Sequence, residues 1–529
     1  MKKNIVFYCL FLLSTCISAQ RPIDVQSYHF NIGLNDNNDS IRGKAIILIR
    51  FTETTNTFDL DLAGVKGNGK GMHIYKVSGQ GVRGINKGEE NSFKVILIKS
   101  MNAGDTATYT VDYGGIPADG LIISKNKYGQ RSFFADNWPD RGRNWLPCND
   151  VPADKAAVTF SVTAPQHYQV VANGIQYEET NLPDNMKRTL WKEDVPISTK
   201  VMVIGVARFA VQLSGIVDGC IPVYSWVYPE DRDKGFYDYA QASEILPFFI
   251  KKVGPYAYKK LANVESKTTF GGLENANTIF YSETSVTGTR KSESLIAHEI
   301  AHQWFGNMAT EKTFAHLWLS EGFATYMAIL YLEDKYGWDT ARAMLIEDRH
   351  QAIAFSKRNS SAVVDNNADF MQLLNANSYQ KGGWALHMLR RQLGDSIFWK
   401  SIRAYYSTYA GGTADTDDLR KVFEKTSGKN LKKFFDQWLY SPGQPELIVG
   451  WKYDEKNKKV LFDIKQEKTK FEFPLQVAIK NPAGKIELVT IMIKEGNTST
   501  SITVKEKPAL VILDPEVSLL YSGTVREIK

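Results

Sequence analysis

Cysteine, long apolar runs and excess charge of one sign are all scarce in this chain of 529 residues. It has only four cysteines, so a disulfide-dense scaffold is excluded. After residue 19, no segment is apolar enough to cross a membrane. The formal net charge of +6 is small for this length and gives no indication of nucleic-acid binding. These absences favour a globular protein with room for about three domains.

The first nineteen residues read as a secretory signal peptide. Lys2 and Lys3 precede an apolar run, and small residues end the segment at Ala19. Its removal lowers the formal charge from +6 to +4. We therefore expect an exported protein, periplasmic or extracellular. A membrane anchor is disfavoured because the apolar run is too short. Lipid attachment through Cys16 is a further alternative, although a threonine before the cysteine is unusual.

Two cysteines, Cys148 and Cys220, lie outside the predicted signal peptide. Export permits a disulfide between them, and two unpaired, buried thiols are the alternative. Neither has metal-ligand spacing to another cysteine or histidine. The sequence leaves the choice open.

The periodicity of apolar residues divides the rest of the chain into three parts. We therefore expect a multidomain α+β architecture. From Ile23 to about Phe209 apolar residues alternate, as in Tyr28-x-Phe30-x-Ile32, which predicts an antiparallel β domain over residues 20–210. Helical spacing dominates residues 211–442. Alternation returns over residues 443–529, where we expect a small β-sandwich.

The segment His298-Glu299-Ile300-Ala301-His302 carries the strongest chemical signal. On a helix its two histidines lie one turn apart on one face, so both imidazoles can bind one metal ion. Glu299 then lies close enough to reach a water on that metal without ligating it. This arrangement is typical of zinc metallopeptidases, in which the glutamate is the general base.

A catalytic zinc of this kind needs a third protein ligand. Glu321 is nineteen residues after His302, and Ala324, Thr325 and Ala328 share its helical face. Side chains this small would let a second helix approach the first closely. His316 is the competing ligand, but it is predicted to lie between the two helices. We therefore expect His298, His302 and Glu321 to hold the metal.

With Gly271-Gly272-Leu273-Glu274-Asn275 upstream and Trp318-Leu319-Ser320-Glu321-Gly322-Phe323-Ala324 around the third ligand, the chain resembles the aminopeptidase N and leukotriene hydrolase family of zinc metallopeptidases. The resemblance implies a thermolysin-like, mostly helical catalytic domain with one zinc ion per chain. Larger family members continue into a long helical domain. Without one, we expect a more open cleft, or one covered by a partner.

The resemblance also implies roles for individual residues. Glu274 would bind the free α-ammonium of a substrate, while Gly271 and Gly272 would pair with its extended backbone. Leu273 replaces a methionine common at that position. Tyr379, in Tyr379-x-Lys381-Gly382, would donate a hydrogen bond to the developing oxyanion.

A second signature, beginning at Arg143-Asn144-Trp145-Leu146-Pro147-Cys148, also resembles the family. Many members place a substrate-contacting glutamine shortly before it. Here that stretch reads Ala135-Asp136-Asn137-Trp138, so Asn137 is the candidate substitute.

These features together predict a zinc-dependent aminopeptidase acting on peptides with a free N-terminus. A zinc endopeptidase is one alternative, which Glu274 in its motif disfavours. A catalytically silent peptide-binding module is another, disfavoured by the intact set of predicted site residues. Epoxide hydrolysis is a third alternative, which is disfavoured because nothing in the sequence marks a lipid channel. The sequence does not determine the preferred substrate residue, the oligomeric state or the metal bound in the cell.

Overall fold

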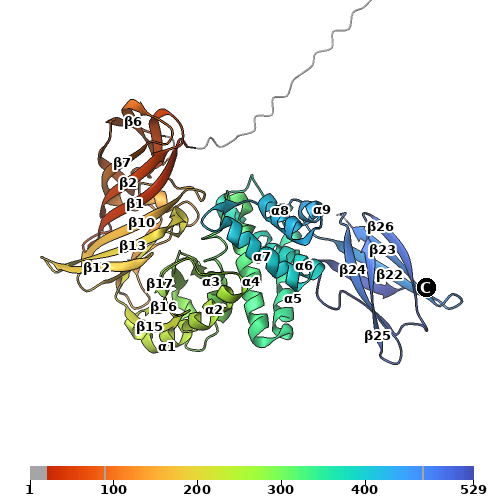
Figure 1. The fold of residues 1–529 in the computed structure, drawn as a ribbon. Helices are drawn as coiled ribbons and strands as arrows, with labels where there is room; N and C mark the ends of the chain where they lie inside the picture. Colours follow the sequence, from red (N-terminus) through yellow and green to blue (C-terminus); the bar gives the residue numbers. More distant parts are fainter. Residues whose placement is uncertain (1–20, 89–90, 468–469, 529) are drawn as a thin grey trace, which may run out of the picture.

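The computed structural model describes residues 21–88, 91–467 and 470–528. The predicted signal peptide, with Cys16, lies outside the described residues. Among the described helices, none combines the length and apolarity needed to cross a membrane. The fold is multidomain α+β, as predicted, with β structure at both ends of the chain and helices in between (Figure 1).

Three sheets form the N-terminal part, and alternating side chains of their strands are buried. In β1, for example, Tyr28, Phe30 and Ile32 are all at most 2% exposed. The pairing is antiparallel, as predicted, except between β1 and β10, which run parallel. The sheets have the orders β12-β13-β10-β1-β2-β7-β4, β11-β14-β9-β8 and β3-β6-β5. The strands are β1 (Ile23–Gly33), β2 (Ile41–Phe51), β3 (Thr55–Asp61), β4 (Gly71–Gly79), β5 (Val82–Lys87), β6 (Ser92–Met101), β7 (Thr106–Ile116), β8 (Leu121–Lys125), β9 (Arg131–Ala135), β10 (Lys155–Pro165), β11 (Gln169–Ala172), β12 (Ile175–Leu182), β13 (Met186–Ser198) and β14 (Ile204–Ala207).

The central part combines a five-stranded mixed sheet with helices. The sheet has the order β15-β16-β17-β19-β18, so the short strand β18 lies at its edge. The strands are β15 (Ala210–Val217), β16 (Ile221–Val227), β17 (Leu261–Ser266), β18 (Gly272–Leu273) and β19 (Thr278–Ser282), and a separate pair joins β20 (Thr310–Glu311) to β21 (Thr413–Ala414). The helices are α1 (Arg232–Tyr239), α2 (Ala242–Lys252), α3 (Glu293–Ala301), α4 (Trp318–Tyr336), α5 (Trp338–Ser356), α6 (Gly382–Leu393), α7 (Asp395–Tyr409), α8 (Thr416–Ser427) and α9 (Lys432–Trp438).

The C-terminal part contains two sheets, ordered β26-β23-β22-β28 and β25-β24-β27. Their strands are β22 (Glu446–Asp454), β23 (Lys459–Glu467), β24 (Phe473–Lys480), β25 (Ile486–Ile493), β26 (Asn497–Thr503), β27 (Leu510–Leu513) and β28 (Ser522–Glu527). Alternating residues such as Val449 and Val477 are fully buried. This part contacts the helices through Arg349, which pairs with Asp514 at 3.0 Å. His387 is also structural, because its Nε2 lies 2.8 Å from the carbonyl oxygen of Val517.

The predicted boundary at 210/211 falls at the start of β15, and the boundary at 442/443 falls between α9 and β22. Both cysteines are free thiols, so the disulfide alternative is not realised. Cys148 is buried as expected, but Cys220 is exposed, because it lies in the turn between β15 and β16.

A buried ion pair joins the N-terminal part to the central part. The Lys200 ammonium, just after β13, lies 2.5 Å from the carboxylate of Glu311 on β20, and the two side chains are 1% and 0% exposed. Nearby, Lys155 donates hydrogen bonds to the carbonyl oxygens of Asn307 and Met308, at 3.0 and 2.7 Å. These contacts connect the β domain to the segment between α3 and α4.

We expect Lys200→Met to lower the free energy of unfolding by about 3–5 kcal/mol, because it leaves the Glu311 carboxylate buried without its partner. The double variant Lys200→Met/Glu311→Leu should recover much of the loss. Urea unfolding followed by tryptophan fluorescence measures both. The matched control is Lys432→Met, which removes an exposed pair with Asp436 and should cost less than about 1 kcal/mol. Equal losses in the buried and exposed variants would contradict the expectation.

Candidate active site

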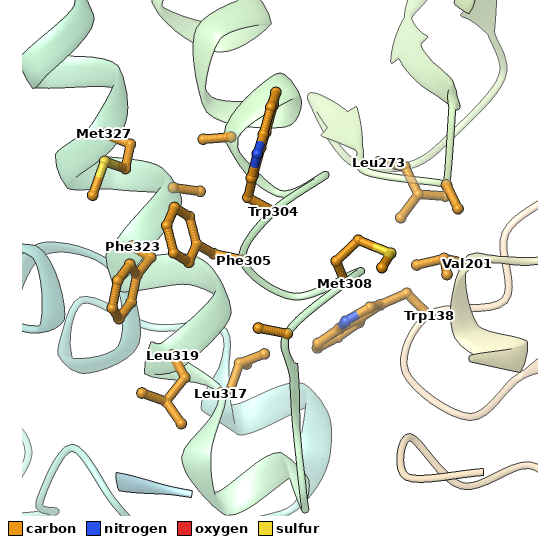
Figure 2. Packing of buried hydrophobic residues seen from close by; sticks show 14 of the residues in the cluster. Trp138, Val201, Leu273, Trp304, Phe305, Met308, Leu317, Leu319, Phe323 and Met327 are labelled. Carbon is orange, nitrogen blue, oxygen red and sulfur yellow. The ribbon is translucent and has the colours of Figure 1, made fainter. Parts of the chain in front are cut away.

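His298 and Glu299 lie on α3, and His302 caps its C-terminal end. The helix stops there because the chain turns back at Gly306, whose φ is +112°. A Cβ at Gly306 would also lie 2.2 Å from Ser320 Oγ. Trp304 and Phe305 therefore follow the helix instead of extending it. Phe305 stacks on Phe323 of α4 at 4.5 Å between ring centroids, as Figure 2 shows.

The structure brings the three predicted metal ligands together. His298 Nε2 and His302 Nε2 lie 3.1 Å apart, and Glu321 Oε2 lies 3.3 and 3.2 Å from them. Ligands held about 2.05 Å from a tetrahedral zinc are separated by about 3.3 Å. The three atoms therefore form one face of a tetrahedron of the right size for zinc. The competing ligand, His316, lies elsewhere, with its Nδ1 2.9 Å from Thr416 Oγ1.

The surroundings of His302 leave its Nε2 available for a metal. Its Nδ1 lies 3.1 Å from the carbonyl oxygen of Phe305 and 3.0 Å from Ser320 Oγ. A carbonyl can only accept, so Nδ1 carries the hydrogen and Nε2 has the free lone pair. The chemistry of the donor set and its spacing therefore fit a zinc ion.

Glu321 reaches the histidines because α4 is held closely against α6. A Cβ at Gly322 would lie 2.9 Å from backbone atoms of Gly382, so only glycine permits this contact. On the face of α4 that was predicted to approach α3, Ala324 is fully buried, and Thr325 and Ala328 line the cleft that contains the metal ligands.

Strand β18 lines the cleft together with α4. Among the described residues it pairs only with β19, which leaves its other edge free for an extended peptide. A Cβ at Gly272 would lie 2.2 Å from Glu299 Oε1, so Gly272 makes room for this carboxylate. Gly271 and Leu273 also line the cleft, and Leu273 is buried.

Hydrogen bonds fix the backbone of Glu274, whereas its carboxylate has no partner among the described residues. Its carbonyl oxygen accepts hydrogen bonds from Gln303 Nε2 at 3.0 Å and Asn307 Nδ2 at 2.6 Å. Its carboxylate lines the cleft, and Oε1 is buried without a hydrogen-bond partner among the described residues. The prediction overlooked Gln303 and Asn307. In the sequence, only their closeness to His302 marks them: Gln303 is the next residue, and Asn307 is five residues after His302.

Tyr379 lies in a π-helical turn, Asn377–Lys381, just before α6. Such turns often occur at functional sites. Its ring is 6.0 Å from that of His298, and it lines the cleft. Burial raises the pKa of the Tyr379 hydroxyl well above its usual range, and nearby carboxylates, Glu321 first among them, add to the shift. The phenol therefore stays protonated and can donate a hydrogen bond.

Asn137 does not have the predicted role of a substrate contact. Its side chain is fully buried, and it donates to the carbonyl oxygens of Thr199 and Met202 at 3.1 and 2.7 Å. Its Oδ1 accepts from Trp145 Nε1 at 2.8 Å. The adjacent Trp138 lines the cleft instead, and Figure 2 shows it close to Met308.

The cleft has a volume of about 470 Å³ and a strongly acidic lining. Burial raises the pKa of the Glu299 carboxyl well above its usual range, and the Glu274 and Glu321 carboxylates contribute in the same direction. A metal dication among these groups would favour their ionised forms. Glu299 could then accept a proton. The prediction missed Met344 and Asp348 of α5, which line one end of the cleft and belong to no motif.

The fold and the site define a metallopeptidase-type centre of two histidines and a glutamate, with a second glutamate beside it. Residues 237–438 match the Peptidase family M1 domain, and residues 25–201 match the Peptidase M1 N-terminal domain. The chain belongs to peptidase family M1.

Aminopeptidases are among the relatives. Aminopeptidase A of Gloydius brevicauda is 27% identical over 406 residues, which are 72% of this chain and 41% of that protein. Glutamyl aminopeptidase of Homo sapiens is 26% identical over 62% of this chain and 36% of that protein. Probable aminopeptidase 2 of Sulfurisphaera tokodaii is 27% identical over 75% of this chain and 51% of that protein. The matches thus span about half or less of these relatives' length.

Proposed function

We propose that this protein is an exported zinc aminopeptidase that hydrolyses the first peptide bond of peptides. The buried, unpaired Glu274 carboxylate beside the metal-ligand cluster carries the proposal. An unpaired carboxylate is costly to bury, and a substrate α-ammonium would satisfy it. The relatives' names agree on removal of N-terminal residues. Export is supported by the signal-like pattern of residues 1–19.

Different residues of the cleft would bind the metal and transfer the proton. Zinc held by His298, His302 and Glu321 would polarise the peptide carbonyl and lower the pKa of water to about 7. Glu299 would accept the proton of the attacking water and return it to the leaving amine.

Two other groups would position the substrate and stabilise charge. Tyr379 would donate its hydrogen to the carbonyl oxygen as negative charge develops there. Glu274 and the free edge of β18 would place the substrate so that only its first peptide bond reaches the metal ligands.

The proposal is tested with aminoacyl reporter amides, each compared with its N-acetylated twin. We expect the free amides to be cleaved at least about tenfold faster, because acetylation removes a charge-assisted hydrogen bond to a buried carboxylate. In Glu274→Gln this preference should largely disappear, because the amide carries no charge. The ratio of kcat/KM values for each pair of substrates is the measurement. A range of first residues in the panel also gives the side-chain preference.

Other outcomes would point to the alternatives. Equal cleavage of acetylated amides and of internal bonds would show that Glu274 is not an amine anchor and would favour an endopeptidase. Zinc binding without any cleavage would favour a peptide-binding module.

A further inference from the structure

Contacts between α3 and the segment around β18 give the cleft a direction. At one end, the Glu274 carbonyl is bound by Gln303 and Asn307, which follow the C-terminal end of α3. At the other end, a Cβ on Gly271 would lie 3.9 Å from Leu295 Cδ1, one turn before His298. A substrate anchored by its amine at Glu274 therefore extends past the metal ligands toward Leu295.

Helix α4 runs antiparallel to α3 along the same cleft. Ser320 contacts His302 near the C-terminal end of α3, while Tyr331 donates to Glu293 at the start of α3, at 2.9 Å. Residues of α4 beyond Glu321 thus lie progressively farther toward the leaving-group end. Thr325 is the first of those that line the cleft.

Helix α5 adds an acid to this end of the cleft. Helix α5 packs against α4 and runs back beside it after Gly337 (Figure 1). Counting the same number of residues back from Gly337 places Asp348 opposite residue 326, about 7.5 Å along the helix axis beyond Glu321. One extended substrate residue spans about 3.3 Å. A side chain as long as lysine, on the residue after the scissile bond, can cover the remaining distance.

The Asp348 carboxylate has no partner, unlike its neighbours in the chain. Glu347 accepts a hydrogen bond from Gln351 at 3.0 Å, and Arg349 pairs with Asp514 at 3.0 Å. No hydrogen bond or ion pair joins Asp348 to any other described residue. It nevertheless lines the cleft, whose described lining contains no lysine or arginine. A cation at this point must therefore come from a ligand.

We propose that Asp348 forms a subsite that selects substrates with lysine or arginine as the second residue. This inference rests on the proposed aminopeptidase function and adds a substrate class to it. The aliphatic stem of such a side chain would lie along Ile329 and Met344, which also line this end. Its charged group would meet the carboxylate.

The ionisation of Asp348 makes the selectivity depend on pH. Burial raises the pKa of its carboxyl to about 7, and the charge of Glu347 acts in the same direction. The cleft residues of α4 beyond Glu321 are uncharged, and the π-helical turn that packs against α5 contributes the uncharged Gln380 and Tyr379 to the cleft. The adjacent Lys381 donates its ammonium to Ser441 instead, at 3.1 Å. The preference should therefore be present above pH 7 and be lost as the carboxyl is protonated below it.

The test uses tripeptides that share an N-terminal alanine and differ only in the second residue, which is lysine, its neutral isostere norleucine, or glutamate. We expect wild-type kcat/KM for lysine to exceed that for norleucine by about tenfold or more at pH 8. Asp348→Asn should bring the two within about twofold. Asp348→Lys should favour glutamate. Glu347→Gln, which removes the adjacent but exposed charge, should keep the lysine preference.

Hydrolysis of alanine anilide, which has no second residue, separates this inference from the proposed function. If wild type cleaves the anilide but does not prefer lysine over norleucine, the subsite is wrong and the aminopeptidase stands. If wild type cleaves neither alanine anilide nor any other aminoacyl anilide of the panel, the proposed function is wrong. A lysine preference that survives in Asp348→Asn would also overturn the assignment.

Discussion

Glu299→Gln is expected to lower kcat by about 10³-fold while leaving zinc bound. The amide has the shape of the carboxylate and fits beside Gly272, but it cannot accept a proton from water. General acid–base catalysis typically contributes 10²–10⁴-fold, and here one residue would serve both in the attack and in protonation of the leaving amine. Steady-state hydrolysis of alanine anilide, with metal analysis of the same samples, measures the effect.

Glu293→Gln on the same helix is the matched control. Its carboxylate is occupied by Tyr331 at 2.9 Å and Lys335 at 2.5 Å, and it does not line the cleft. This variant should keep most of the activity. If Glu299→Gln retained more than a tenth of wild-type kcat with a full complement of zinc, the base would have to be another group.

Local patterns predicted most of the architecture, because burial imposes a period on each kind of element. Alternation in Tyr28-x-Phe30-x-Ile32 predicted the first strand, and these residues are buried. The pairing partners of the strands and the ends of the helices were harder to predict from the sequence. The parallel register of β1 with β10 joins segments more than a hundred residues apart. The early end of α3 depends on a turn at Gly306 that packs against Ser320, on another helix.

The site shows the same difference between features set by local sequence and features set by contacts between distant segments. The spacing of His298 and His302 on one helix follows from backbone geometry, so their convergence could be predicted. Glu321 was predicted from its spacing after His302 and from the small residues on its helical face, but the glycine contact between α4 and α6 was not foreseen. Asn137 was misassigned because sequence position does not reveal that its amide groups are used internally. Asp348 was overlooked because only the antiparallel packing of α4 and α5 brings it into the cleft.

Tyr379→Phe is expected to lower kcat by about 10²–10³-fold, a loss of about 2.7–4 kcal/mol of transition-state stabilisation. The hydroxyl would act on charge that develops only as the carbonyl is attacked, so KM should change little. The phenylalanine ring keeps the contact with His298, whose ring lies 6.0 Å away. Separate determination of kcat and KM on alanine anilide distinguishes this effect from weaker substrate binding.

Tyr405→Phe provides the comparison for the loss of a buried hydroxyl. Tyr405 is fully buried, its hydroxyl has no hydrogen-bond partner among the described residues, and it does not line the cleft. Its removal should leave kcat within about twofold of wild type, because a hydroxyl without a partner contributes little. A tenfold higher KM with unchanged kcat in Tyr379→Phe would assign Tyr379 to ground-state binding. The zinc and the backbone would then have to stabilise the oxyanion without it.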